Sequence, residues 1–294
     1  MTDIVTLFGN YPTAFPWLAG LLGLLIGSFL NVVIHRFPII LERKWREQYQ
    51  ELTSPHSPEV KAVERFDLIF PGSRCPHCGH HIRALENIPV LSFLWLGGKC
   101  AACKQPISRR YPAVELVTGL LSAFVAWHFG FGAPALACLI LTWSLVALAF
   151  IDYDTQLLPD DITLPLLWLG LFVNITGTLT PLSSAVIGAM AGYVSLWLVY
   201  QIFRLVTGKE GMGYGDFKLF AALGAWLGWQ SLPLIILASS LLGAVVGIAF
   251  ILFFGRDRHL PIPFGPFLCL AGWIAALWGD SITRLYLQLA RITV

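Results

Sequence analysis

Apolar stretches long enough to cross a lipid bilayer recur along most of this 294-residue chain, and they constrain its fold more than any other feature. A membrane-spanning helix needs roughly 17–25 predominantly apolar residues. The chain is 56% hydrophobic and only 12% charged, whereas soluble domains average about 25% charged residues. The sequence therefore predicts an all-α polytopic membrane protein whose main solvent is the lipid bilayer.

Eight segments are candidates for membrane spans, and a polar region separates the first from the others. They cover residues 17–34, 113–131, 133–151, 162–179, 182–203, 217–229, 232–254 and 264–278, of which the sixth is the shortest. Because no basic stretch precedes the first span, we expect it to be an anchor and not a cleaved signal. The expected organisation is a transmembrane anchor (1–35), a cytoplasmic loop domain (36–112) and a transmembrane helical bundle (113–294).

The distribution of basic residues predicts the orientation of these spans. Of the 19 Lys and Arg residues, 12 fall between Arg36 and Arg110, whereas the short connections on the opposite side carry none. The positive-inside rule then places the 36–112 loop in the cytoplasm and the N-terminus in the periplasm. The net charge of +2 is explained by this topology and gives no reason to expect nucleic-acid binding.

The polar region begins with a segment of mixed charge, residues 41–65, whose centre is rich in Ser and Pro. This composition predicts a short amphipathic helix, a break and a second helix. The segment is expected to be a solvated or membrane-skimming connector, and docking of a substrate is the alternative.

Four cysteines in the polar region form two CxxC pairs: Cys75, Cys78, Cys100 and Cys103. The pairs are separated by 21 residues, which is close to the spacing of four-cysteine zinc ribbons. Two pairs complete a tetrahedral thiolate shell with no open position for water, so the sequence predicts a structural Zn²⁺ site. Disulfides are the alternative, which a reducing compartment disfavours. His77, His80 and His81 are close enough to compete, but we expect them to be solvated or to contact the ligands.

Two aspartates stand where predicted spans meet the cytoplasm. Asp152 directly follows the apolar run 145–151, and Asp216 ends the glycine-rich run 211–216 and opens the next apolar segment. An ionisable residue that enters a membrane segment is a functional candidate because it is costly to place there. Glycines allow close approach of the backbone. We therefore expect both carboxylates to reach the same cytoplasmic mouth of a helix bundle.

Paired carboxylates of this kind can hydrolyse a peptide bond. Like charges a few Å apart cannot both ionise cheaply, so the pair shares a proton. The protonated carboxyl can polarise a peptide carbonyl while the other activates water, which is the chemistry of aspartyl proteases. In the structural alternative, Asp216 caps its helix and Asp152 is an interfacial charge. Spacing alone leaves both interpretations open.

Other acidic residues near these span ends have structural interpretations too. Asp160 and Asp161 fit an N-cap and first-turn role at the start of the next span. Glu115 is expected in the first turn of its span, where a carboxylate suits the helix dipole, so helix stabilisation competes with catalysis there. Asp154 lies two residues from Asp152 and cannot share its helix face.

Several motifs together resemble the bifunctional type IV prepilin peptidases, also called leader peptidase/N-methyltransferases, a family of GxGD-type membrane aspartyl proteases. The matching segments are 27–36 (GSFLNVVIHR), 73–78 (SRCPHC), 86–92 (ENIPVLS), 97–100 (GGKC), 110–115 (RYPAVE), 151–160 (IDYDTQLLPD) and 211–216 (GMGYGD). They run in order across nearly the whole chain. The GxGD signature matches Gly213 to Asp216, and the family's other catalytic aspartate matches Asp152. The resemblance therefore implies that Asp152 and Asp216 are the catalytic pair.

The resemblance also implies a substrate and a compartment. The family cleaves the short basic leader from prepilins and pseudopilins at the cytoplasmic face of the bacterial inner membrane. The scissile bond follows a Gly, and a Phe or Met becomes the first residue of the mature chain. We expect the acidic residues Asp154, Asp160, Asp161 and Glu210 to meet the basic leader.

Methylation of the new N-terminus from S-adenosylmethionine is the second activity that the resemblance implies. Members with both activities carry the large loop with its two CxxC pairs, and this chain has that loop. No glycine-rich strand-to-helix turn of the dinucleotide-binding type is present, so the residues alone do not locate a methyl-donor pocket. Gly98 is the candidate for a residue that methyl transfer needs, and its alternative role is that of a turn glycine before the second cysteine pair.

Two other functions compete with this one. A transporter or channel with a regulatory four-cysteine loop would carry its carboxylates near the middle of the spans, often in repeated halves. Here the carboxylates lie at the span ends, and no repeat is visible. The other is a methyltransferase or scaffold without protease activity, which the presence of both Asp152 and Asp216 disfavours.

Overall fold

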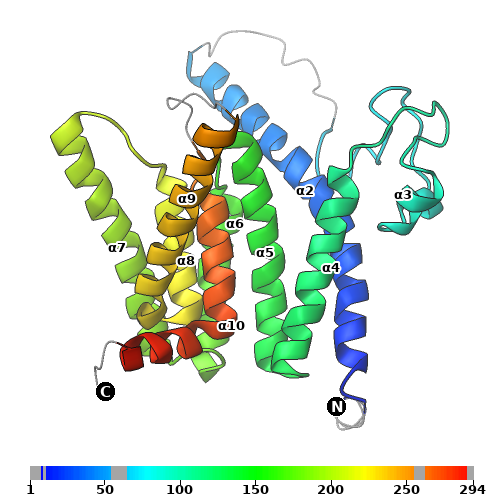
Figure 1. Ribbon diagram of the computed structural model, residues 1–294. Coiled ribbons are helices and arrows are strands. Elements are labelled where there is room, and N and C mark those ends of the chain that lie inside the picture. Colours follow the sequence, from blue (N-terminus) through cyan, green and yellow to red (C-terminus); the bar gives the residue numbers. More distant parts are fainter. Residues whose placement is uncertain (1–7, 9–10, 54–64, 255–261, 290–294) are drawn as a thin grey trace. The chain divides into compact units, whose positions relative to one another are not determined.

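The computed structural model describes residues 8, 11–53, 65–254 and 262–289 (Figure 1). The described residues contain helices and two isolated β-bridges but no strand. Six of their helices are long and apolar enough to cross a membrane. These are α2 (Ala14–Thr53), α4 (Arg110–Phe129), α5 (Ala133–Thr155), α7 (Leu182–Thr207), α9 (Leu232–Phe254) and α10 (Gly265–Leu289). The predicted all-α, multi-pass class is confirmed.

Two of the eight predicted spans correspond to short helices. α6 (Asp160–Val173) and α8 (Tyr214–Leu227) contain 14 residues each. At about 1.5 Å per residue they are about 21 Å long, whereas the hydrocarbon core is about 30 Å thick. The predicted number of eight is therefore approximate, because six of the described helices reach the necessary length.

The chain divides into two compact units, residues 1–127 and 128–294. In the first unit, α2 and α4 pack with their backbones in close contact. A Cβ added to Gly27 would lie 2.7 Å from the Cα of Glu115, and one added to Gly23 would overlap the side chain of Ser122. Small residues at these positions of α2 therefore allow the two helices to meet.

α2 continues as a single helix to Thr53. The first half of the predicted connector is thus helical, as expected. The predicted break and most of the second helix fall on residues 54–64, which lie outside the described residues.

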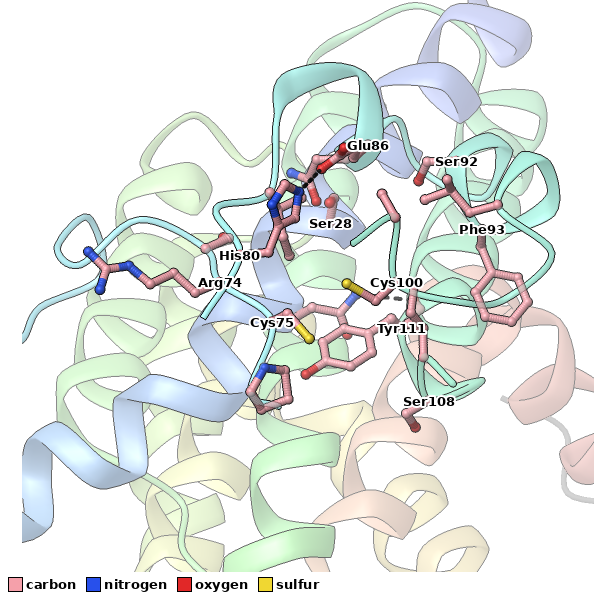
Figure 2. Close-up of a pocket in the computed structure, with 18 of the residues that line it drawn as sticks. Ser28, Arg74, Cys75, His80, Glu86, Ser92, Phe93, Cys100, Ser108 and Tyr111 are labelled. Atoms are coloured by element: carbon pink, nitrogen blue, oxygen red, sulfur yellow. Dashed lines mark hydrogen bonds and ion pairs between the residues drawn. The ribbon is translucent and has the colours of Figure 1, made fainter. Parts of the chain in front are cut away.

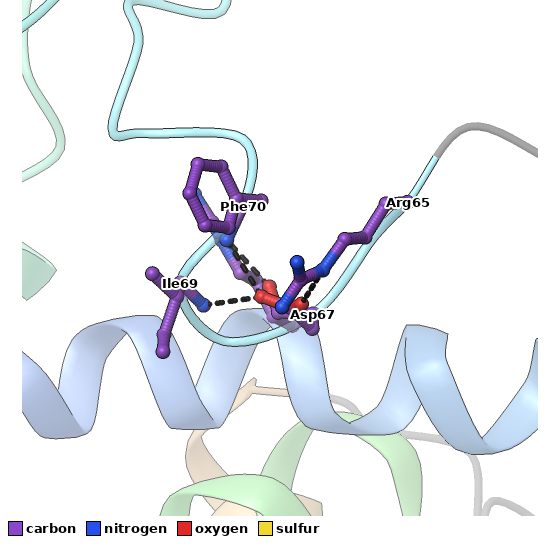
Figure 3. Close-up of polar contacts among 5 residues, drawn as sticks. Arg65, Asp67, Ile69 and Phe70 are labelled. Atoms are coloured by element: carbon purple, nitrogen blue, oxygen red, sulfur yellow. Dashed lines mark hydrogen bonds and ion pairs between the residues drawn. The ribbon is translucent and has the colours of Figure 1, made fainter.

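A tight turn centred on Asp67 follows (Figure 3). Its Oδ1 accepts hydrogen bonds from the backbone N–H groups of Phe70 at 2.6 Å and Ile69 at 2.7 Å. Its Oδ2 accepts one from Arg65 Nε at 2.7 Å. The Phe70 N–H, then Arg65 and Ile69, lower the pKa of Asp67 to about 2. Arg36 of α2 donates to the backbone carbonyl of Asp67 at 3.1 Å, which ties this turn to the helix.

In the second unit, α8 packs against α6 and α7. Its large apolar side chains are almost completely buried: Phe217, Phe220, Leu223 and Trp226. The backbones of Gly188 in α7 and Gly224 in α8 approach so closely that a Cβ on either would overlap the other helix. This close packing fixes the position of α8, which begins two residues before Asp216.

A buried amide holds the far end of α8. The side-chain nitrogen of Asn174 donates to the carbonyls of Ala225 and Trp226, at 2.9 Å each. Its side-chain oxygen accepts from the N–H groups of Leu179 and Thr180, at 3.0 and 3.1 Å. Asn174 thus satisfies helix-end carbonyls that would otherwise be unpaired in an apolar environment.

Candidate functional site

Asp152 and Asp216 lie at helix ends in the second unit. Asp152 is in the last turn of α5, which closes at Gln156 in a left-handed conformation with φ of 53°. Asp216 is in the first turn of α8, after the N-cap residue Gly213. Their side chains are only 5% and 9% exposed. Two acidic groups are therefore withdrawn from bulk water, where an uncompensated charge is costly.

The structure brings these two carboxylates together. Their charges interact directly, and the thiol of Cys269 in α10 lies within range of both. The end of α5, the start of α8 and α10 therefore converge on one acidic site. A negative charge on one of these carboxylates therefore disfavours a negative charge on the other.

Gly265, the first residue of α10, orients Asp152. Its backbone N–H donates a hydrogen bond to Asp152 Oδ2 at 3.0 Å. A Cβ at position 265 would lie 2.6 Å from that oxygen. The sequence analysis missed this residue, and its only local signal is the Pro-Phe-Gly-Pro run at 263–266.

One oxygen of Asp216 has an unusual environment. Oδ1 is buried and has no hydrogen-bond partner among the described residues. Buried polar atoms are nearly always paired, so an unpaired one calls for an explanation such as a catalytic role or an absent water. This oxygen is available to a water molecule or to a substrate.

The glycines of the GxGD signature are not equivalent. A Cβ on Gly215 would lie 2.7 Å from the Cβ of Leu158 and 3.2 Å from its carbonyl oxygen. A Cβ on Gly213 would meet only Asp216 Oδ2, at an ordinary 3.8 Å. The close approach expected of this segment is therefore required at Gly215, where the start of α8 passes the chain that precedes α6.

The four acidic residues expected to meet the leader are all exposed: Asp154, Asp160, Asp161 and Glu210. Asp160 is paired with Lys218 of α8, whose Nζ lies 2.6 and 2.7 Å from its two carboxylate oxygens. Asp160 and Asp161 lie in the first turn of α6, and the N-cap is Pro159. The predicted position of both aspartates in the first turn is confirmed. The predicted N-cap role is wrong, because Pro159 occupies the N-cap position.

The four cysteine sulfur atoms all lie within 4.8 Å of one another. Cys75 Sγ and Cys103 Sγ are 3.8 Å apart. That is close to the edge of a tetrahedron whose metal–sulfur bonds measure about 2.3 Å. The geometry and the soft thiolate donors therefore fit a closed, four-coordinate metal site.

The two CxxC pairs form structurally equivalent turns. The carbonyl of Cys75 accepts from Gly79 N at 2.9 Å, and its N–H donates to His80 O at 2.9 Å. At the second turn, Cys100 makes the same two bonds with residues 104 and 105, at 3.1 and 2.8 Å. Backbone N–H groups of Cys78 and His77 lower the pKa of Cys75 to about 7, which favours the metal-binding thiolate.

The neighbouring histidines are not part of the metal cluster found among the described residues. His80 Nε2 instead lies 3.0 Å from Glu86 Oε2. The same oxygen accepts the backbone N–H of Arg83 at 3.1 Å. His80 and Glu86 thus connect the first cysteine turn to the short helix η1 (Ala84–Asn87).

A cavity of about 400 Å³ lies within the first unit, where the cysteine turns face α2 and α4 (Figure 2). Phe93 of α3 (Leu91–Trp95) is on its wall. Gly98 lies behind that wall, with φ of 69° and a Cβ position only 3.0 Å from the Phe93 ring. Its carbonyl accepts the N–H of Ile107, another wall residue, at 2.7 Å. Gly98 therefore adjoins two residues of the cavity wall without lining the cavity itself.

Comparison with known proteins decides the family. The family described as the bacterial peptidase A24 N-terminal domain matches residues 21–129, and the type IV leader peptidase family matches residues 139–248. The chain belongs to the type IV leader peptidase family. The boundary between the two matches lies close to the boundary between the two compact units.

Relatives of this leader peptidase align over almost their entire length. A protein of Stutzerimonas stutzeri is 58% identical over 99% of this chain and 100% of its own. One of Pseudomonas aeruginosa is 57% identical over 96% of both chains, and one of Legionella pneumophila is 48% identical over 95% of this chain and 96% of its own. Each is called a prepilin leader peptidase/N-methyltransferase. The expected class of enzyme, a peptidase and methyltransferase, is confirmed. No solved structure matches.

Proposed function

We propose that this leader peptidase cleaves the leader from prepilins and pseudopilins and then methylates the new N-terminus with S-adenosylmethionine. The pairing of buried Asp152 and Asp216 carries the peptidase part of this proposal. Near-complete alignment with prepilin leader peptidase/N-methyltransferases supports the substrate and the second activity.

The aspartate pair hydrolyses the leader by acid–base catalysis. One carboxyl group donates a hydrogen bond to the scissile carbonyl, and the other accepts a proton from the attacking water. This step gives a tetrahedral intermediate and no covalent acyl-enzyme. The scissile C–N bond then breaks as a carboxyl group of the pair donates a proton to the leaving amine, which releases the leader and the mature chain. The N–H of Gly265 holds Asp152 in one orientation, and the unpaired Oδ1 of Asp216 is free to contact water or the peptide.

The four cysteines hold a structural Zn²⁺ ion in this proposal. Four thiolates fill its coordination shell, so the metal supplies folding energy to the loop and no catalytic water. The equivalence of the two cysteine turns supports this role, because both present their sulfur atoms in the same way.

The enzyme is proposed to lie in the bacterial inner membrane with its N-terminus in the periplasm. The concentration of Lys and Arg between residues 36 and 110 supports a cytoplasmic position for that region. The substrate then presents its apolar helix from within the bilayer and its basic leader from the cytoplasm, where cleavage takes place.

The peptidase proposal is tested by incubating a purified prepilin with the detergent-solubilised enzyme and reading the mature N-terminus by mass spectrometry. Asp152→Asn and Asp216→Asn should leave the leader uncut. Asp280→Asn, at an exposed position of α10, is the matched control and should cleave normally. Near-normal cleavage by either site variant would show that the catalytic assignment is wrong.

The acidic residues near the site are proposed to bind the basic leader. The test reverses the charge at Asp154, Asp161 and Glu210 and leaves Asp160 unchanged, so that its ion pair with Lys218 stays in place. The triple variant should raise the KM for a basic leader and change kcat little. An unchanged KM would refute leader binding by these residues.

Gly98 is proposed to support methyl transfer by shaping the cavity. Gly98→Val would force a β-branched side chain into a left-handed conformation and against Phe93. Methylation should fall while leader cleavage continues. Mass spectrometry of the product N-terminus separates the two steps, and full methylation would show that Gly98 is only a turn residue.

A further inference from the structure

The cavity of the first unit is enclosed by elements that are distant in sequence. Ser28 and Asn31 of α2 line one side, and Tyr111 and Glu115 of α4 line another. Asn31 also donates to the carbonyl of Tyr111 at 3.1 Å, which joins the two helices at this level. The volume of about 400 Å³ is within the range of small-molecule pockets, roughly 300–1,000 Å³.

A buried carboxylate projects from the second turn of α4 into this wall, and not from the first turn as the sequence predicted. Glu115 is only 8% exposed, and its Oε2 accepts the backbone N–H of Val90 at 2.8 Å. The Ser28 side chain also bonds to this carboxylate. Both of these hydrogen-bond donors are uncharged. Neither of them therefore neutralises the negative charge of the carboxylate.

The residue that Glu115 holds has a strained backbone. Val90 has φ of 59° and ψ of −47°, and the N–H of Leu91 donates to the carbonyl of Pro89 at 2.6 Å. This is a γ-turn with a positive φ at its central residue, the rare and strained type. A positive φ is especially unfavourable for a β-branched residue. Such strain is typically kept where the surrounding structure needs it for function. Here the strained turn at Val90 fixes the start of α3, and α3 places Phe93 on the cavity wall.

The rest of the wall offers a second carboxylate and aromatic faces. Glu86 lies on it beside His80 (Figure 2). The rings of Phe93 and Tyr111 also belong to lining residues, whereas the side chain of the exposed Arg74 points away from the other residues drawn. Carboxylates suit a cationic ligand, and rings suit a flat heterocycle.

We propose that this cavity binds S-adenosylmethionine and receives the new N-terminal amine, with Glu115 as the anionic group that attracts their positive charges. The inference rests on the proposed methyltransferase function and adds its location. The donor combines an adenine ring and a positively charged sulfonium, and the wall has a complementary group for each. Aromatic residues contact the ring, and Glu115 faces the sulfonium.

The transfer balances without any further reactant. The new N-terminal ammonium loses a proton to a solvent water molecule, and its nitrogen forms a bond to the methyl carbon. The bond from that carbon to the donor sulfur breaks, and the neutral S-adenosylhomocysteine leaves. The sulfonium charge disappears in the step, so the surrounding carboxylates help to bind the cationic donor more tightly than the neutral product.

Donor binding is measured directly by isothermal titration calorimetry of S-adenosylmethionine into the full-length, zinc-loaded enzyme in detergent. Glu115→Gln keeps an oxygen for the Val90 N–H and removes only the charge, and we expect about tenfold weaker binding. Phe93→Ala should also weaken binding about tenfold. The matched control is Leu94→Ala, an exposed neighbour that does not line the cavity, which should bind within about twofold of wild type.

Zinc content and leader cleavage, measured on every variant, show whether it is folded. Unchanged donor affinity in folded Glu115→Gln and Phe93→Ala would overturn the proposed location while leaving methyltransferase function intact. A wild-type enzyme that cleaves leader but binds no donor would overturn the methyltransferase function itself, and this location with it.

A measurement on the wild type alone remains decisive if the variants do not fold. Ultraviolet crosslinking of radiolabelled S-adenosylmethionine, followed by peptide mapping, should label the cavity-lining segments of the first unit, residues 28–36 and 73–115. Labelling confined to residues 128–294 would overturn the inference. Excess S-adenosylhomocysteine should abolish the labelling if the site is specific.

Discussion

The backbone N–H of Gly265 donates a hydrogen bond to the Asp152 carboxylate, although the two residues lie 113 positions apart in the sequence. Gly265 is the first residue of α10, so the position of this helix determines how the carboxylate is aimed. This hydrogen bond requires that position 265 carry no side chain, because an added Cβ would overlap the Asp152 carboxylate.

Gly265→Ala should impair leader cleavage strongly. Its Cβ would lie 2.6 Å from Asp152 Oδ2, so the carboxylate or the helix end must shift. A displacement of about 1 Å at a reacting group lowers catalysis by about 100-fold. We expect that loss mainly in kcat, measured by the rate of prepilin processing.

The matched control is Gly279→Ala in the same helix. A Cβ there would meet its nearest neighbours at an ordinary 3.9 Å, so near-wild-type processing is expected. Equal losses in both variants would mean that α10 is sensitive to any added side chain, and that the contact with Asp152 has no special importance.

The two signature glycines should differ in their tolerance of alanine. Gly215→Ala would bring a methyl group 2.7 Å from Leu158, and overpacking of this kind costs about 1–3 kcal/mol. Gly213 has an extended backbone with φ of −79° and room for a methyl group. We therefore expect Gly215→Ala to lower both the melting temperature and the cleavage rate more than Gly213→Ala. The reverse order would contradict the assigned packing.

Asn174→Ala should destabilise the second unit without touching the aspartates. It removes four hydrogen bonds and leaves buried carbonyl and N–H groups unpaired, at a cost of about 3 kcal/mol in the free energy of unfolding. Thermal unfolding in detergent measures this loss. Thr176→Ala, at an exposed position two residues away, should leave the melting temperature almost unchanged.

Removal of one thiolate should empty the proposed metal site. Cys75→Ser leaves three cysteines in the cluster, so zinc content measured by elemental mass spectrometry should fall from about one ion per chain to near zero. Cys138→Ser, which lies in α5 outside the cluster, should retain zinc. Zinc retained by Cys75→Ser would point to a different ligand set.

Acid should weaken the turn at Asp67. Its pKa is lowered from 3.8 to about 2 by the bond from Phe70 N–H, then by Arg65 and Ile69. A group whose folded pKa is depressed contributes stability above its unfolded pKa, and loses that contribution as pH falls towards the folded value. Amide exchange at Phe70 should therefore accelerate between about pH 4 and pH 2, and Asp67→Asn should remove this pH dependence.

The sequence predicted the elements whose signals are local. Apolar runs located all six long helices, because hydrophobicity over about 20 residues is a property of the segment itself. CxxC spacing identified the four sulfur atoms that the fold gathers. The aspartates were singled out because each lies beside an apolar run, and the structure brings the two together.

Contacts between distant segments could not be predicted in this way. Gly265 with Asp152 spans 113 positions, Lys218 with Asp160 spans 58, and Glu115 with Val90 spans 25. Glu115 was expected to serve its own helix, whereas its carboxylate bonds to the backbone of a different segment. The span predicted at 162–179 was too long, because α6 ends at Val173. The span predicted at 217–229 has nearly the length of α8 but was placed a few residues too late.

The shortness of α6 and α8 bears on how water, the second substrate of a hydrolase, reaches a site within the membrane. A helix about 21 Å long is shorter than the hydrocarbon core, which is about 30 Å thick, so its two ends cannot both reach the bilayer surfaces. Asp216 lies in the first turn of one of these helices. Water that reaches the start of α8 from one interface can then meet the carboxylates without a pore that crosses the whole bilayer.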